Sequence, residues 1–290
     1  MLTMKKLLMK TIKKIRSKYP QAAFLIGNGP NLSAHIFPSW KELLIAAADG
    51  GKKFDIEGLT NTEVYDLVEL HAADSKLVKQ RVCNELEFKT SMDTAIHQRL
   101  MEYAVLTKSP VLTTNFDAAF ETAIGADLLH IESKDFTRFY PWKSYYGFDK
   151  HQLPTAGFGI WKIHGDVHYK DSIRLGLTDY MGSVERARKL IHKGDDRLFQ
   201  GKQQDFWGGF QTWLHIWFNL PIIIFGFGYD TDEIFLRWLL IERKRYLNLT
   251  ASPMEVWYLT TSPLKPSVKN FMENLDVKFI KVDKYSDLYG

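Results

Sequence analysis

The chain has 290 residues, of which 45% are hydrophobic and 14% aromatic, enough to bury a large core in one α/β domain. Its formal net charge is +4, but seven Lys and Arg residues and no acid fall within the first twenty positions, and the rest has 31 basic and 34 acidic residues. This balance does not indicate the broad positive surface that nucleic-acid binding requires. The single cysteine, Cys83, excludes an internal disulfide and a Cys₄ zinc site.

The sequence does not predict a membrane or secreted protein. Its longest apolar run, residues 220–227, is interrupted by Pro221 and Gly226 and is much shorter than the roughly twenty residues of a membrane span. The basic N-terminus has neither the apolar core nor the small-residue cleavage site of a secretion signal. We therefore expect a cytoplasmic protein.

Residues 4–18, within an N-terminal segment of residues 1–20, predict an amphipathic helix. Leu8, Ile12 and Ile15 recur at helical spacing, lysines occupy other positions, and Pro20 follows. We interpret this segment as a helix docked through its apolar stripe rather than as an arm for membranes or nucleic acid.

A strand at residues 22–26 then runs into Gly27-Asn28-Gly29. Such a turn lets the backbone approach a pyrophosphate, whose charge is met by free N–H groups at the start of the next helix. The third glycine of the dinucleotide fingerprint is missing, however, and Pro30 has no N–H. An ordinary strand-to-helix turn explains these glycines equally well.

The next part of the chain has mainly helical periodicity. Residues 39–44 predict a capped helix, and the pattern is helical almost throughout residues 61–108. This stretch is longer than a simple crossover between strands. We therefore expect a helical insert over about residues 45–108, beside the sheet, where it can cover a site.

Three apolar runs end in polar or glycine residues. Residues 111–114 lead to Asn115 and Asp117, residues 161–164 end at His164, and residues 220–225 lead to Gly226. In a parallel sheet, the carboxyl ends of the strands deliver side chains to one edge. The three ends therefore predict one shared crevice.

The remaining elements alternate between helix and strand. We expect loops with a hairpin over residues 136–159 and a further hairpin over residues 167–176. Helices are predicted at 118–124, 178–192, 206–219, 232–246 and 266–275, and strands at 128–131, 255–260 and 277–282. This order predicts one α/β domain over residues 1–290, with a doubly wound, mainly parallel Rossmann-like sheet and a helical insert.

The order of the motifs resembles the sirtuin-like family, in particular its bacterial anti-phage branch that hydrolyses NAD⁺ and lacks the zinc ribbon. The resemblance rests on Gly-x-Gly-x-Asn, Thr-Thr-Asn-x-Asp, Lys-Ile-His-Gly and Gly-x-Gly-x-x-x-Asp, spread over about residues 22–261. It implies a catalytic asparagine at Asn115 and a catalytic histidine at His164. The positions that it implies for NAD⁺ binding are Gly27, Asn28, Gly29, Asn31, Ser33, Thr114, Asp117, Gly226, Phe227, Gly228 and Asp232.

Two of these positions depart from the family pattern. Asn28 replaces the usual alanine, and Gly228 replaces the usual serine, which removes one hydroxyl contact to the cofactor. The family's zinc module also requires cysteine pairs, and this chain has one cysteine. The resemblance without zinc therefore favours water over an acylated peptide as the nucleophile at the ribose, and we expect no metal.

The candidate residues suit the cleavage of a glycosidic bond. Loss of nicotinamide from ribose needs a stabilised oxocarbenium-like state and a positioned water. An amide such as Asn115 can hold that water or the carboxamide, and the imidazole of His164 can accept a proton. Taken singly, Asn115 could instead be a helix cap and His164 a core histidine. Asp166 and His168 could orient the imidazole or solvate a loop, and we favour the loop.

We expect an NAD⁺ glycohydrolase that releases nicotinamide and ADP-ribose and depletes NAD⁺ during phage infection. Two alternatives remain open: a non-catalytic subunit that binds NAD⁺ or ADP-ribose, and a sirtuin-type protein deacylase or ADP-ribosyltransferase. Because uncontrolled NAD⁺ loss is toxic, we also expect regulation through a homo-oligomer or through a partner protein from the same defence operon.

Overall fold

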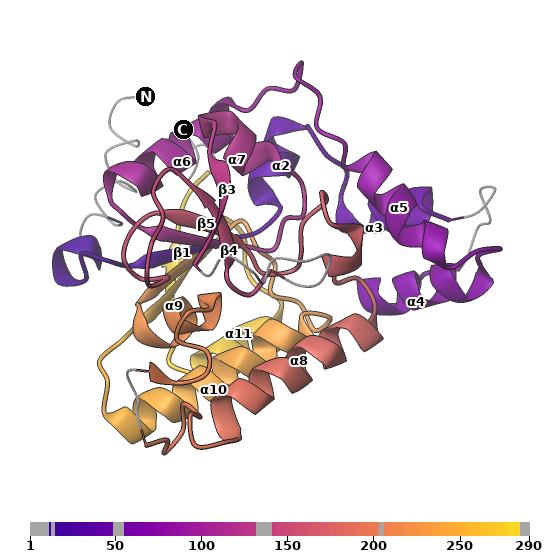
Figure 1. Ribbon diagram of the computed structural model, residues 1–290. Helices are drawn as coiled ribbons and strands as arrows, with labels where there is room; N and C mark the ends of the chain where they lie inside the picture. Colours follow the sequence, from indigo (N-terminus) through magenta and orange to yellow (C-terminus); the bar gives the residue numbers. More distant parts are fainter. Residues whose placement is uncertain (1–11, 13–14, 49–54, 132–140, 203–205, 285–290) are drawn as a thin grey trace.

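A computed structural model describes residues 12, 15–48, 55–131, 141–202 and 206–284. Its centre is an eight-stranded sheet in the order β3-β4-β5-β2-β1-β6-β7-β8 (Figure 1). The strands are β1 (Ala23–Ile26), β2 (Pro110–Thr113), β3 (Asp127–His130), β4 (Ser144–Gly147), β5 (Gly159–Lys162), β6 (Ile222–Phe225), β7 (Val256–Thr260) and β8 (Lys278–Lys281).

The sheet is doubly wound and mainly parallel, as predicted. From β1 the chain adds β2 and β5 on one side, then returns to add β6, β7 and β8 on the other, and all of these neighbours pair in parallel. Only β4, among the described strands, runs antiparallel to its neighbours, β3 and β5. The chain changes direction between β1 and β6, which is where ligands bind in sheets of this kind.

Helices cover both faces of the sheet, and their bounds follow from the structure. They are α2 (Gly29–Ala34), α3 (Trp40–Ala46), α4 (Asn61–His71), α5 (Lys76–Glu85), α6 (Ala95–Leu106), α7 (Ala119–Ile124), α8 (Leu177–His192), α9 (Trp213–Asn219), α10 (Ile234–Thr250) and α11 (Pro266–Glu273).

Alternating side chains of the buried strands supply a core on each face. Ala23 and Leu25 of β1 pack in a cluster with residues of α8, α9, α10 and α11. Phe24 and Ile26 point to the opposite side and pack in a cluster with residues of α6 and α7. Because both faces are buried, β1 reads as a continuous apolar run rather than as an alternating one.

The helices α3, α4 and α5 form a third core beside the sheet (Figure 1). Leu43, Val64 and Val82 from these helices belong to the same buried cluster as Phe116, which follows β2. In contrast, α6 packs against α7 and the sheet. Helices α3, α4 and α5 therefore share a buried cluster with the turn that carries Asn115, while α6 belongs to the cover of the sheet.

The N-terminal helix expected over residues 4–18 lies largely outside the described residues, and this includes Leu8. Ile12 and Ile15 are described, and both are buried in the core beside α6. Arg16 donates a hydrogen bond to the Thr107 carbonyl at 2.7 Å. These contacts fix the start of the described chain to the end of α6.

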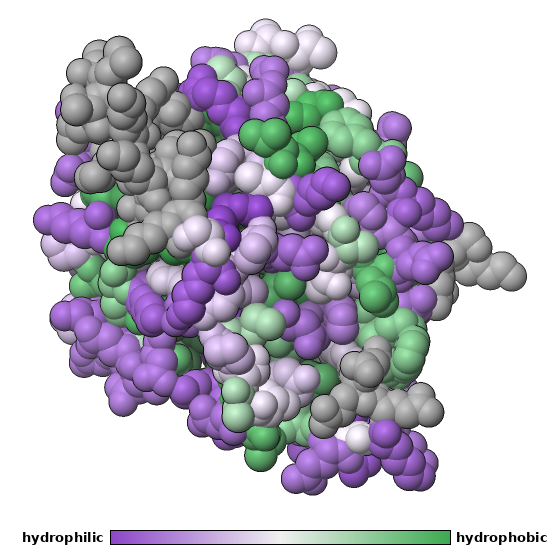
Figure 2. All heavy atoms as spheres, turned by 90° about the vertical axis from the view of Figure 1, so that its left-hand side faces the viewer, coloured by the Kyte–Doolittle hydropathy of each residue, from purple (hydrophilic) through white to green (hydrophobic). Residues whose placement is uncertain are grey.

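The surface and the helices bear on the expectation that no segment crosses a membrane. Among the described residues, no helix combines the length and the apolar composition of a membrane span. On the face shown in Figure 2, hydrophilic residues predominate and hydrophobic residues form small separate patches.

Two predicted elements differ from the structure. The hairpin expected at residues 167–176 is absent: Asp166 and Tyr169 form an isolated bridge, and a short 3₁₀ helix, η2 (Lys170–Ser172), follows. The helix expected from residue 206 begins only at Trp213, because Thr212 caps it by accepting a hydrogen bond from the Leu214 N–H. Within residues 136–159, where a hairpin was expected, the structure describes the strand β4, whose antiparallel partners are β3, at residues 127–130, and β5, at residues 159–162.

The ends of β1 and β6 lie so close together that Gly27 has no room for a side chain. A Cβ atom there would lie 2.7 Å from the Gly226 carbonyl oxygen and 2.8 Å from the Phe227 Cβ. We expect Gly27→Ala to lower the free energy of unfolding by about 1–3 kcal/mol, because the strand ends must separate. Denaturant unfolding measures this change.

Gly228 provides the matched control, because no heavy atom lies within 4 Å of a Cβ built there. We expect Gly228→Ala to change the free energy of unfolding by no more than about 0.5 kcal/mol. Equal losses in the two variants would contradict the proposed close contact.

Candidate active site

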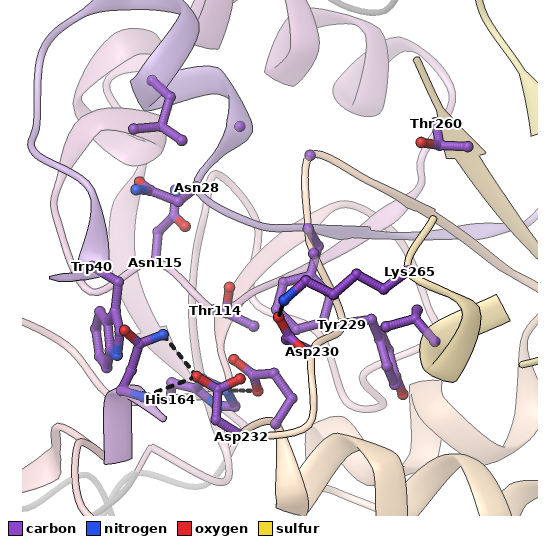
Figure 3. Close-up of a pocket in the computed structure, with 18 of the residues that line it drawn as sticks. Asn28, Trp40, Thr114, Asn115, His164, Tyr229, Asp230, Asp232, Thr260 and Lys265 are labelled. Atoms are coloured by element: carbon purple, nitrogen blue, oxygen red, sulfur yellow. Dashed lines mark hydrogen bonds and ion pairs between the residues drawn. The ribbon is translucent and has the colours of Figure 1, made fainter. Parts of the chain in front are cut away.

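A cleft of about 480 Å³ opens at the carboxyl ends of β1, β2, β5 and β6 (Figure 3). Its volume is within the range of about 300–1,000 Å³ that small-molecule sites occupy. In Figure 3, Trp40, His164 and Asp232 lie at one end and Thr260 and Lys265 at the other. The cleft therefore spans the switch point from the helical α3–α4 side to the loop after β7.

Asn115 follows β2 and lines this cleft. Its side chain is 5% exposed, and its backbone N–H is held by the Thr113 hydroxyl at 3.1 Å. Within the described part of the chain, the side-chain Nδ2 has no hydrogen-bond acceptor. A buried amide group without a protein partner is costly, so a ligand oxygen or a water would complete it.

His164 follows β5 and lines the same cleft. Its Nδ1 lies 3.0 Å from the Ile163 carbonyl oxygen, and its Nε2 lies 2.9 Å from Oε2 of Glu233. The ring of Tyr180 packs edge-on against the imidazole, with centroids 5.3 Å apart. The imidazole therefore has three contacts, and Glu233 is the charged residue among them.

Asp117 is a structural partner of the turn after β1. Its carboxylate accepts hydrogen bonds from the Ala119 N–H at 2.9 Å and from the Asn31 amide at 2.7 Å. The Asn31 amide also donates to Asn28, and its oxygen accepts from Nε2 of His97 at 2.7 Å. Burial lowers the pKa of His97, which favours the neutral ring. This network joins the ends of β1 and β2.

Lys162, at the end of β5, is buried below the cleft. Its ammonium donates to the backbone oxygens of Phe116 at 3.1 Å and Asp117 at 2.6 Å. It also lies 2.5 Å from the Glu121 carboxylate and 3.7 Å from that of Asp166. The lysine of the Lys-Ile-His-Gly motif thus fixes the backbone that presents Asn115.

The charges around Lys162 titrate away from their usual ranges. Burial raises the pKa of Glu121 to about 7, although the lysine opposes this. For Asp166, Lys162 and the hydrogen bonds from His168 and Tyr146 outweigh burial and lower the pKa to about 2. One ligand atom each of Glu121, Asp166 and His168 lies within 4.8 Å of the others, a spacing that suits a cation. The Lys162 ammonium already supplies that positive charge.

The predicted acid of the last motif, Asp232, also lines the cleft. Its carboxylate accepts from the Asn61 side-chain amide at 2.7 Å and from the Asn61 N–H at 3.3 Å. Burial, followed by the charge of Glu233, raises the pKa of Asp232. Because Asn61 begins α4, this carboxylate connects the helical layer to the end of the cleft that contains His164.

The structure brings together most of the residues that the motifs singled out. Those lining the cleft are Asn28, Gly29, Thr114, Asn115, Asp117, His164, Gly226, Phe227, Gly228 and Asp232. Gly27, Asn31 and Ser33 do not line it. The N–H of Gly29 donates to the Gly226 carbonyl at 2.8 Å, so it is not free as the pyrophosphate interpretation supposed. Contacts of these residues with NAD⁺ remain predictions.

Three residues of this region, Glu233, His97 and Lys162, have roles that were not predicted from the sequence. Glu233 follows Asp232 directly, and three acids within residues 230–233 were the available signal. His97 was hidden in a helical stretch, and Lys162 was noted only as part of a motif. The interpretation of Asp166 as a solvated loop residue was wrong, because it is 1% exposed and accepts a hydrogen bond from the Tyr146 hydroxyl at 2.6 Å.

Comparison with known families gives one match. The family model of the SIR2-like domain covers residues 109–280, more than half of the chain. The matched range contains Asn115, His164 and Gly226 but not the Gly27 turn. No curated protein matches the chain.

The buried position of Lys162 predicts a large effect of its removal. Lys162→Met leaves Glu121 and Asp166 without their counter-charge, so we expect a loss of about 3–5 kcal/mol in the free energy of unfolding. The control is Lys202→Met, because that side chain is 77% exposed in its pair with Asp195, and we expect less than about 1 kcal/mol. Chemical denaturation compares the two variants. A loss below about 1 kcal/mol for Lys162→Met would contradict the stabilising role of the buried Lys162 ammonium.

The raised pKa of Glu121 predicts how stability depends on pH. The folded state holds the Glu121 proton up to a pKa of about 7, whereas the ordinary value is 4.5. The contribution of this group is therefore fully present below pH 4.5 and is lost as the pH rises through 7. We expect Glu121→Gln to flatten the fall of Tm over this interval.

Calorimetric unfolding at a series of pH values tests this prediction. Glu185→Gln is the control, because that carboxylate is 67% exposed, and its slope should equal that of the unmodified protein. An unchanged slope in Glu121→Gln would show that another group causes the dependence.

Proposed function

The chain belongs to the SIR2-like domain family, an NAD-dependent enzyme family, and on this premise we propose that it is an NAD⁺ glycohydrolase. The proposed reaction releases nicotinamide and leaves ADP-ribose. The supporting observation is that Asn115 and His164, from the ends of adjacent strands β2 and β5, line one cleft of ligand size. This arrangement presents an amide and an imidazole to one ligand.

The amide of Asn115 suits the leaving group or the attacking water. Its Nδ2 has no acceptor within the described residues, and its oxygen can accept a hydrogen bond from water. Holding the water close to the ribose carbon removes much of the entropic cost of the reaction. Asn115 therefore acts in the proposal by orientation rather than by proton transfer.

The charge of the cleft suits a cationic substrate group. Asp232 and Glu233 line the end that contains His164, and Asp230 lies nearby in an ion pair with Lys265. The nicotinamide of NAD⁺ is positively charged, and the ribose becomes positive as the bond breaks. Carboxylates at this end favour both the bound cation and the transition state.

Hydrolysis is favoured over deacylation by two features. The chain has one cysteine, so it has no cysteine pairs for a zinc module. In addition, Asn61, Thr62 and Leu86, from the α4–α5 region, line the cleft and narrow the space for a peptide. Water is the nucleophile that needs no additional binding surface.

We further propose a role in anti-phage defence through NAD⁺ depletion, which the motif order in the sequence supports. An enzyme that destroys a shared cofactor must be held inactive until it is needed. Control by a homo-oligomer, or by a partner protein from the same operon, is the form of regulation that we propose. Nicotinamide release assayed with and without the neighbouring gene products tests this part.

A second candidate is a subunit that binds NAD⁺ or ADP-ribose without chemistry. Two observations favour it: both nitrogens of His164 already have partners, and the Gly29 N–H is used within the protein. Calorimetry that shows ADP-ribose binding without NAD⁺ turnover, in every activating condition tried, would select this candidate.

The proposed activity predicts the effect of removing either side chain. We expect Asn115→Ala and His164→Ala to lower nicotinamide release by about 10²-fold or more, because each variant loses an orienting or proton-transfer group. Release is followed by chromatography of NAD⁺ incubations. Asn84→Ala, at an exposed position of α5, serves as the control and should retain activity. Full activity in both site variants would refute the proposal.

A further inference from the structure

We infer that the Glu233 carboxylate, rather than the His164 imidazole, accepts the proton of the attacking water, and that His164 positions this carboxylate. The inference rests on the proposed NAD⁺ hydrolysis and assigns a further catalytic residue to it. Glu233 was not identified from the sequence motifs. It lines the cleft, and its side chain is 18% exposed, whereas that of His164 is only 2% exposed.

The first argument is the number of protons around the imidazole. The Ile163 carbonyl can only accept a hydrogen bond, so the His164 Nδ1 at 3.0 Å from it carries a proton. One further proton lies between Nε2 and Oε2 of Glu233, which are 2.9 Å apart. In the proposed reaction Nε2 holds that proton and donates it to the carboxylate, so Glu233 can take a further proton from water. His164 therefore has no free lone pair for a ligand in this arrangement.

The second argument is the position of Glu233 at the start of α10. It is the N-cap residue of this helix, which extends from Ile234 to Thr250. The positive end of a helix dipole favours a carboxylate in its ionised form. The start of α10 and the contact with His164 together hold the Glu233 carboxylate at the cleft.

The third argument is the chemistry of the developing charge. As the bond between ribose C1 and nicotinamide breaks, the electron pair leaves with the neutral nicotinamide and C1 becomes cationic. The water oxygen then bonds to C1, and one water proton passes to the Glu233 carboxylate. The products are nicotinamide, ADP-ribose and one proton. A carboxylate can stabilise the cationic state and also take the proton, whereas an imidazolium can do neither.

The neighbouring groups suit this assignment. Asp232 precedes Glu233, and its carboxylate is engaged by the Asn61 side chain at 2.7 Å. Asp232 is therefore held toward α4, and Glu233 is held toward His164 at β5. Of these two adjacent acids, Glu233 is the one that contacts the imidazole of the family motif.

Glu233→Gln tests the assignment, because it keeps the shape of the side chain and removes its ability to take a proton. We expect kcat to fall by about 10²–10⁴-fold and KM for NAD⁺ to rise by much less, since the variant loses general-base catalysis but only part of the negative charge that favours the bound cation. His164→Asn should lose less kcat than Glu233→Gln, because it removes only the positioning group. Glu185→Gln, at an exposed position on α8, should match the unmodified protein.

Chemical rescue separates a proton acceptor from a structural group. Formate should restore part of the turnover of Glu233→Ala, because a small carboxylate can occupy the vacated space, and it should not restore His164→Ala. Thermal unfolding confirms that the variants are folded. Turnover of Glu233→Gln equal to or above that of the unmodified protein would overturn the inference while leaving NAD⁺ hydrolysis intact. If the unmodified protein releases no nicotinamide with any partner, the proposed function fails and the inference fails with it.

Discussion

The site depends on one buried ammonium group. Lys162 donates to the backbone oxygens of Phe116 and Asp117 and is neutralised by Glu121 and Asp166. The lysine comes from β5 and the carbonyls from the turn after β2, so the interaction joins two strand ends below the cleft. A charge at this depth is tolerated because these two backbone acceptors and two carboxylates surround it. The position of Asn115 is a consequence of that balance.

The rest of the cleft is built on the same principle, with buried polar groups joining segments far apart in the chain. His97 of α6 binds Asn31 of α2, which binds Asp117 after β2. On the opposite side, Glu233 before α10 binds His164 after β5. Each connection satisfies a buried polar atom and fixes the distance between two elements. The apolar cores determine the layers of the fold, and these polar pairs determine the shape of the cleft.

Much of this fold could be predicted from local pattern. Continuous apolar runs, such as the one that forms β6, identified the central strands because both faces of the sheet are covered. The positions of Asn115 and His164 at strand ends followed from the motifs. Partners across long separations could not be predicted: nothing near Lys162 in the sequence indicates that its ammonium reaches Glu121. The late start of α9 was also missed, because aromatic spacing before Thr212 imitated a helix that the Gly208-Gly209 pair interrupts.

The hydrogen bonds between Asn61 and Asp232 connect helix α4 to the loop after β6. Asn61 is the first residue of α4, and Asp232 precedes Glu233, whose carboxylate contacts His164. A partner that binds the outer surface of α4 or α5 would therefore shift the position of Glu233 and His164 without entering the cleft. Natural variation on that distant surface would be expected to alter catalytic output as well as recognition, so the two properties would evolve together.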